Sequence, residues 1–132
     1  MNRLRPAIAG LLTCGVLVLG AGAARGHHSF DAEYDSNKPI TLTGIVTQLD
    51  WNNPHAYVHV SVRDAGGAVK SYKVEMGPPY ALVRGGWKRD TIKAGDLVTI
   101  TNAAAAKDGT NAAGSMPTTS MTLAAGTKLV MR

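Results

Sequence analysis

Four histidines are the side chains of this 132-residue sequence with the clearest capacity for chemistry. His27 and His28 are adjacent, His55 follows the segment Trp51-Asn52-Asn53-Pro54, and His59 comes four residues later. Neutral imidazole is a common ligand for copper, nickel and zinc. Asparagine tolerates turn conformations and proline fixes φ, so the segment before His55 is suited to aim its ring. We therefore expect a transition-metal site made by His27, His28 and His55.

The ligands that His27 supplies depend on where the mature chain begins. Residues 1–26 have two arginines near the start, Arg3 and Arg5, then an apolar run over residues 7–19, and then small residues at the end. This is the layout of a secretory signal peptide. The apolar run is shorter than the roughly 20 residues of a membrane-spanning helix. We expect cleavage after Ala23, Ala24 or Gly26, with Gly26 favoured. The result is a periplasmic protein without stable membrane insertion.

The two later cleavage sites give different copper chemistry. A chain that begins at His27 chelates one ion through its amine and imidazole, and a further imidazole completes a T-shaped site that copper accepts. A chain that begins Arg25-Gly26-His27 offers the amine, two amide nitrogens and the imidazole to a square-planar Cu(II) or Ni(II) ion. The alternative is an exposed polar tip that binds metal adventitiously, with His55 as a hydrogen-bonded turn residue. His59 is expected at the surface, since four strand residues place it about 13 Å from His55.

Cysteine and charge exclude several other classes of protein. The single cysteine, Cys14, lies within the predicted signal peptide, so the mature chain has no thiol for a disulfide or a cysteine metal site. Cleavage after Gly26 removes three of the 14 basic residues, which leaves 11 against 9 acidic ones. Charges of both signs alternate, as at Lys73 and Glu75, and no positive stripe remains. We therefore expect no nucleic-acid partner.

Three classes of function stay open, with metal binding first. The second is a non-catalytic binding module that holds an envelope protein or a small apolar ligand around Trp51, Asn53, Tyr57 and Trp87. An enzyme comes third, because the sequence has no Gly-x-Ser-x-Gly, no His-Glu-x-x-His and no phosphate-binding glycine motif. Three methionines are conceivable soft ligands for Cu(I) or simply core filler, namely Met76, Met116 and Met121.

Short strands are the elements that must position these side chains. Residues 40–51 are rich in β-branched side chains, and their apolar parity shifts around Gly44, which predicts a bulge or a bend. Apolar and polar residues alternate over residues 56–63, which predicts a half-buried strand with Val58 inside and His59 outside. Trp51 is expected to be buried as well.

The remaining elements complete a small mainly β fold. We expect a strand over residues 71–76, a short helix over 80–84, a strand over 97–101, and a last strand over 116–131 that folds over at Ala125-Gly126. Residues 103–109 have few large apolar side chains and predict a frayed strand end and a loop. The order predicts a five-stranded OB-like Greek-key barrel with one short helix between strands 3 and 4. Another small β-barrel or a sandwich is the alternative.

The expected domain organisation has three parts. A signal peptide covers residues 1–26, an N-terminal arm covers residues 27–38, and the OB-like β-barrel domain covers residues 39–132. Phe30 and Tyr34 are the side chains that could pin the arm to the wall of the barrel.

Several motifs together resemble those of one family. They are Gly26-His27-His28-Ser29-Phe30, Thr43-Gly44, Trp51-x-Asn53-Pro54-His55, Gly86-Trp87-x-Arg89-Asp90 and Ala106-Lys107-Asp108-Gly109. This set is similar to that of a family of short exported proteins of Gram-negative bacteria classed as a domain of unknown function. The resemblance covers essentially the whole mature chain, although the sequence departs more from the family after Ala112. It implies export and a single domain, and it supplies no mechanism.

Overall fold

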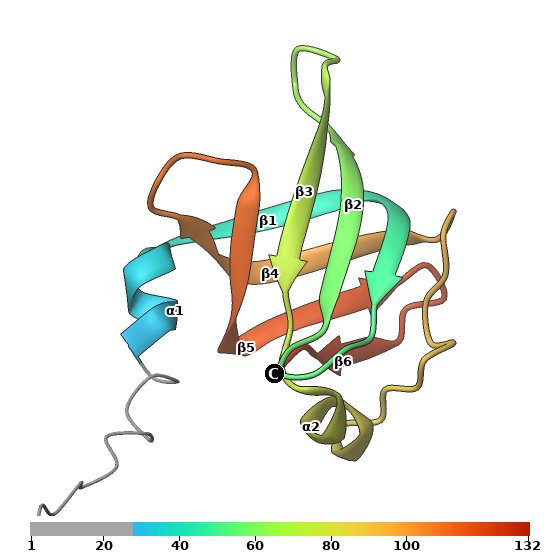
Figure 1. The fold of residues 1–132 in the computed structure, drawn as a ribbon. Coiled ribbons are helices and arrows are strands. Elements are labelled where there is room, and N and C mark those ends of the chain that lie inside the picture. Colours follow the sequence, from blue (N-terminus) through green and yellow to red (C-terminus); the bar gives the residue numbers. More distant parts are fainter. Residues whose placement is uncertain (1–27) are drawn as a thin grey trace, which may run out of the picture.

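Strands dominate the computed structural model, which describes residues 28–132. The predicted signal peptide and His27 lie outside the described residues. The elements in chain order are α1 (His28–Glu33), β1 (Tyr34–Asp50), β2 (Tyr57–Arg63), β3 (Val69–Glu75), α2 (Pro79–Arg84), β4 (Leu97–Ala106), β5 (Ala112–Leu123) and β6 (Lys128–Val130) (Figure 1). Within these residues, neither helix is long and apolar enough to cross a bilayer.

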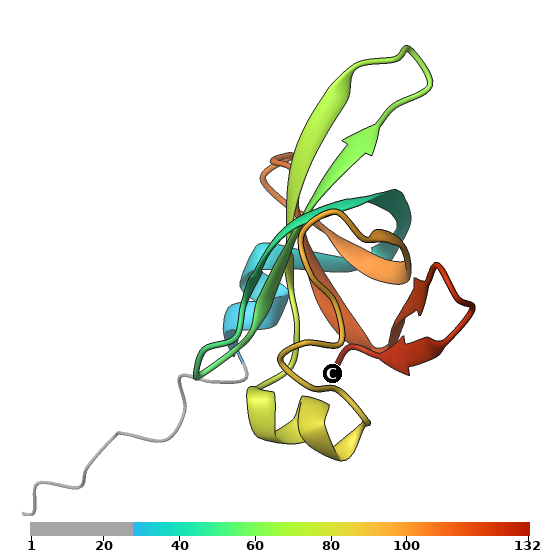
Figure 2. The same ribbon diagram turned by 90° about the vertical axis from the view of Figure 1, so that its right-hand side faces the viewer.

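The strands pair in the order β3-β2-β1-β4-β5-β6, and neighbours in this order are antiparallel. An additional parallel pairing joins Lys73, Val74 and Glu75 of β3 to β5, so the pairings of β1 to β5 form a closed ring. The β2–β3 hairpin projects from one end of the molecule, and α2 covers the opposite end (Figures 1 and 2). The antiparallel pairing of β2 with β3 places the loop before β2 close to the end of β3.

β1 is the longest strand and belongs to both neighbouring pairs, because its first half pairs with β4 and its second half with β2. Gly44 lies where the two pairings overlap, opposite Val62 on one side and Val98 on the other. A Cβ atom at this position would overlap the carbonyl oxygen of Ser61, so only glycine fits. The register of β1 shifts at three points, between residues 35 and 39, between 40 and 42, and between 46 and 48, so Gly44 lies between the last two.

The core is formed by apolar side chains of the strands, together with side chains from α2 and the residues that flank it. Val58 is fully buried, as the alternation predicted, and its neighbour His59 is partly exposed. Trp51 is only partly buried and packs against the core from the β1–β2 loop. The largest fully buried side chains are Trp87, Met76, Leu82, Ile100, Met121 and Met131.

Besides the partial exposure of Trp51, the structure differs from the sequence-based prediction in its strands and in a second helix, α1, where one helix was expected. Six strands are present rather than five, because β6 is a separate strand that returns onto β5. β1 begins at Tyr34, so residues 34–38 of the expected arm belong to the sheet. The alanines at 103–106 continue β4 where a frayed end and loop were expected, because they are paired with β1 on one side and β5 on the other. Tertiary pairing overrides their weak β propensity.

Candidate functional site

His55 is held in one orientation by a carboxylate on the neighbouring strand. The backbone nitrogen of Ala56 donates to Gly77, and that of Met76 donates to Ala56, which fixes the loop before β2 to the end of β3. The His55 side chain then hydrogen-bonds through Nδ1 to Oε1 of Glu75. Because a carboxylate only accepts, Nδ1 is the donor in this hydrogen bond. The His55 side chain is 40% exposed.

Glu75 is in turn held by a buried tyrosine from β1. The hydroxyl of Tyr34 donates to Oε2 of Glu75 at 3.0 Å, and the Glu75 side chain is only 13% exposed. Burial, and then the negative charge of Glu75, raise the pKa of Tyr34 well above its ordinary value, so the phenol stays a donor. We call this arrangement the His55–Glu75–Tyr34 network. It connects the β1–β2 loop, β3 and the start of β1.

The helix that precedes Tyr34 packs against β5 and the end of β4 (Figure 1). The rings of Phe30 and Tyr34 lie 5.0 Å apart between centroids, and Gly114 of β5 lies directly beneath both of them. The backbone nitrogen of Lys107 donates to Glu33 at 2.9 Å, and its ammonium group donates to a second carbonyl of α1. The arm from Phe30 onward is therefore packed on the sheet, through the two aromatic residues expected to pin it.

Gly114→Ala is expected to lower the free energy of unfolding by about 1–3 kcal/mol, the usual effect of overpacking. A Cβ atom there would lie 2.5 Å from Cε2 of Phe30 and from Cδ2 of Tyr34, and rigid rings cannot yield as a flexible side chain can. Urea denaturation measures the change. Gly66→Ala is the matched control, because a Cβ atom in that turn meets only a carboxylate oxygen at 3.4 Å. Equal stability of the two variants would contradict the packing of the arm.

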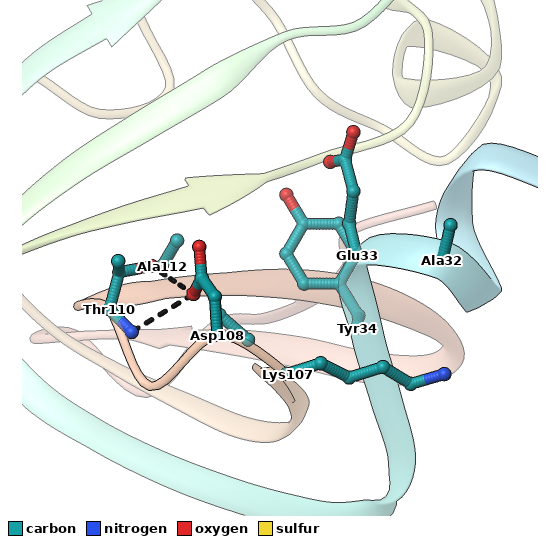
Figure 3. Close-up of a pocket in the computed structure, with 8 residues that line it drawn as sticks. Ala32, Glu33, Tyr34, Lys107, Asp108, Thr110 and Ala112 are labelled. Carbon is teal, nitrogen blue, oxygen red and sulfur yellow. Dashed lines mark hydrogen bonds between the residues drawn. The ribbon is translucent and has the colours of Figure 1, made fainter.

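A polar groove of about 580 Å³ lies beside Tyr34, between α1 and the β4–β5 loop (Figure 3). Its lining residues are Ala32, Glu33, Tyr34, Ala106, Lys107, Asp108, Thr110 and Ala112. The Asp108 carboxylate accepts from the backbone nitrogen and the hydroxyl of Thr110, which lowers the pKa of Asp108. Charged and hydroxyl groups therefore lie beside the alanines in the wall of this groove.

His59 belongs to a second, separate histidine–carboxylate pair. Its Nε2 lies 2.8 Å from Oδ2 of Asp50. Hydrogen bonds from Gln48 and then from His59 hold the pKa of Asp50 below its ordinary value. His55 and His59 therefore use different carboxylates, and the structure does not bring them together. This agrees with the separation expected from strand geometry.

The other residues singled out in the sequence lie in different environments. The Trp87 ring is 1% exposed and its Nε1 donates to the carbonyl of Val130 at 2.7 Å, so it offers no surface to a partner. Tyr57 is half-buried, and the Lys73 ammonium lies 4.2 Å from its ring centroid. Asn53 is exposed in the loop before His55. Of the three methionines, Met76 and Met121 are in the core and Met116 is half-buried.

Tyr34 and Glu75 are the site residues that sequence reasoning missed. Glu75 is 20 residues from His55 and 41 from Tyr34, so no local spacing reveals the contacts. Within residues 28–132, no three histidine, cysteine or acidic side chains could hold a metal ion together.

Comparison with known proteins gives one match. A family model described as a family of unknown function, DUF6152, matches residues 15–115. No curated protein and no solved structure matches the chain.

Proposed function

We propose that this chain, which belongs to the DUF6152 family of unknown function, is an exported copper-binding protein of the periplasm. In this proposal signal cleavage makes His27 the first residue. The amine and imidazole of His27, with the imidazoles of His28 and His55, supply the ligands. These are nitrogen donors, and among divalent first-row ions Cu²⁺ binds such donors most tightly.

The state of His55 is the observation that carries the proposal. A histidine that binds a metal nearly always donates its other ring N–H to a carboxylate, a carbonyl or water. His55 has such a partner, because its Nδ1 donates to the Glu75 carboxylate, and its side chain is 40% exposed.

The packing of α1 favours a joint site over a loose metal-binding tail. His28 is the first residue of α1, and this helix is anchored by the ring of Phe30 and by the hydrogen bonds from Lys107. The start of the mature chain is thus attached to a packed element. An ordered attachment lowers the entropy lost when ligands from the arm and from His55 bind the same ion.

The pairing order supports an OB-like Greek-key barrel as the scaffold. The ring β1-β2-β3-β5-β4 and the helix between β3 and β4 are the features of that fold. OB-folds bind ligands at the face of strands 2 and 3 and at the loops that follow strands 1 and 4. His55 lies in the first of these loops, and the groove beside Tyr34 borders the second.

The alternative, a module for an envelope protein or a small apolar ligand, has less support. Of its four residues Trp87 is buried and Tyr57 is partly covered by Lys73, which leaves Trp51 and Asn53. Within the described residues no specific contact favours one such partner.

Intact mass spectrometry of the exported protein tests the proposal directly. We expect the mass of a chain that begins at His27, because the small residues Ala24 and Gly26 precede it. After incubation with Cu(II), this mass should increase by one copper ion per chain. A mass that retains residues 1–26, or a lipid increment on Cys14, would contradict the predicted export. A correctly processed chain without a copper increment would contradict metal binding.

A further inference from the structure

We propose that Tyr34 is a positioning residue of the copper site, which fixes the orientation of His55 through Glu75. This inference rests on the proposed function and extends it to a residue that binds no metal. The hydrogen bonds that carry it are those of the His55–Glu75–Tyr34 network.

Glu75 can orient His55 only if its own carboxylate cannot rotate. Each of its oxygens has one partner, His55 on Oε1 and Tyr34 on Oε2. Its backbone is fixed as well, because the Ser115 hydroxyl donates to the Glu75 carbonyl at 2.6 Å. Without the phenol, Oε2 would lose its partner and the carboxylate could turn about its last bond. The direction of the His55 ring would then vary.

Tyr34 is suited to this role because its own position is set by packing. Its side chain is buried, with Phe30 beside it and Gly114 beneath it. Burial also keeps the hydroxyl protonated, so it remains a donor to Glu75. Tyr34 directly follows α1, the helix that begins at His28. The same side chain therefore ties the arm and the His55 loop to one carboxylate.

The test compares Tyr34→Phe with Tyr57→Phe in the mature chain. Tyr57 pairs directly with Glu75 across the strands, but its hydroxyl makes no hydrogen bond within the described residues. Loss of an outer partner of a metal ligand typically weakens metal binding by 10–100-fold. We expect Tyr34→Phe to weaken Cu(II) affinity about tenfold and to change the Cu(II) electron paramagnetic resonance spectrum. Tyr57→Phe should alter neither, and the spectrum also separates a change at the ion from a loss of stability.

Two further variants separate the failure of this inference from the failure of the proposed function. If His55→Ala changes the copper spectrum and Tyr34→Phe leaves both affinity and spectrum as in the wild type, Tyr34 is not a positioning residue and the copper site stands. If His55→Ala also leaves them unchanged, His55 is not a ligand and the joint copper site of the proposed function is wrong. Glu75→Gln tests the same link should Tyr34→Phe not fold. His55 and Tyr34 bind different oxygens of Glu75, and in the variant one of these oxygens is replaced by an amide nitrogen that cannot accept a hydrogen bond. An unchanged spectrum would overturn the inference.

Discussion

Trp87→Ala is expected to lower the free energy of unfolding by about 3–5 kcal/mol, the largest effect on stability that we predict for a single side chain. The ring is 1% exposed and is the largest fully buried side chain of the described residues. Its removal leaves a cavity and also an unpaired carbonyl at Val130, which accepts from Nε1 at 2.7 Å. Urea denaturation of the variant and of the wild type measures the loss.

Two control variants separate the parts of this effect. Trp87→Phe keeps most of the ring volume and loses the hydrogen bond, so about 1–3 kcal/mol is expected. Tyr80→Ala removes a ring from α2 that is 64% exposed, and such a surface change should stay within about 0.5 kcal/mol. A Trp87→Ala variant as stable as Tyr80→Ala would contradict the placement of Trp87 in the core.

Regular alternation made some of the fold predictable from sequence. The period of two over residues 56–63 correctly placed Val58 inside, because each one-residue step along a strand moves a side chain to the opposite face. No such signal exists at residues 103–106, where four alanines have the same size and no pattern. Their strand depends on β1 and β5, which are distant in sequence.

The helix α1 is a second element that local sequence could not reveal. Six residues are too few to be helical on their own, because nucleation of a helix is unfavourable. Its stability comes from contacts with Lys107 and with the surface of β5 beneath Phe30. The presence of an arm with two aromatic anchors was predictable, and its conformation was not.

Of the His55–Glu75–Tyr34 network, the sequence indicated His55 but not its two partners. The turn chemistry of Asn53-Pro54 marked His55 as an oriented side chain. Its partner Glu75 resembled any other outward residue of a half-buried strand, and Tyr34 resembled an apolar anchor. The β2–β3 pairing brings the end of β3 to the β1–β2 loop, and the pairings through β4 and β5 add the start of β1.

His55→Ala is expected to weaken the Cu(II) affinity of the mature chain by at least about tenfold, or about 1.4 kcal/mol, because loss of a ligand should cost no less than the roughly 10–100-fold typical of an outer partner. The variant removes one of the proposed ligands and leaves the amine and the imidazoles of His27 and His28. The ring of His55 is partly exposed and lies outside the core, so the fold should persist. Isothermal titration with Cu(II) gives the affinity. His59→Ala is the matched control, because His59 pairs with Asp50 and should leave the affinity unchanged.

The most direct test of the copper site compares three titrations with Cu(II), namely those of the mature chain, of its His55→Ala variant and of an isolated peptide of residues 27–38. The arm and the loop before β2 are proposed to bind one ion together, so the mature chain should bind more tightly than the other two. The peptide and the His55→Ala variant should then have similar affinities, since both keep only the ligands of the arm. Equal affinities for all three would contradict the joint site, because the start of the chain would then bind copper without His55.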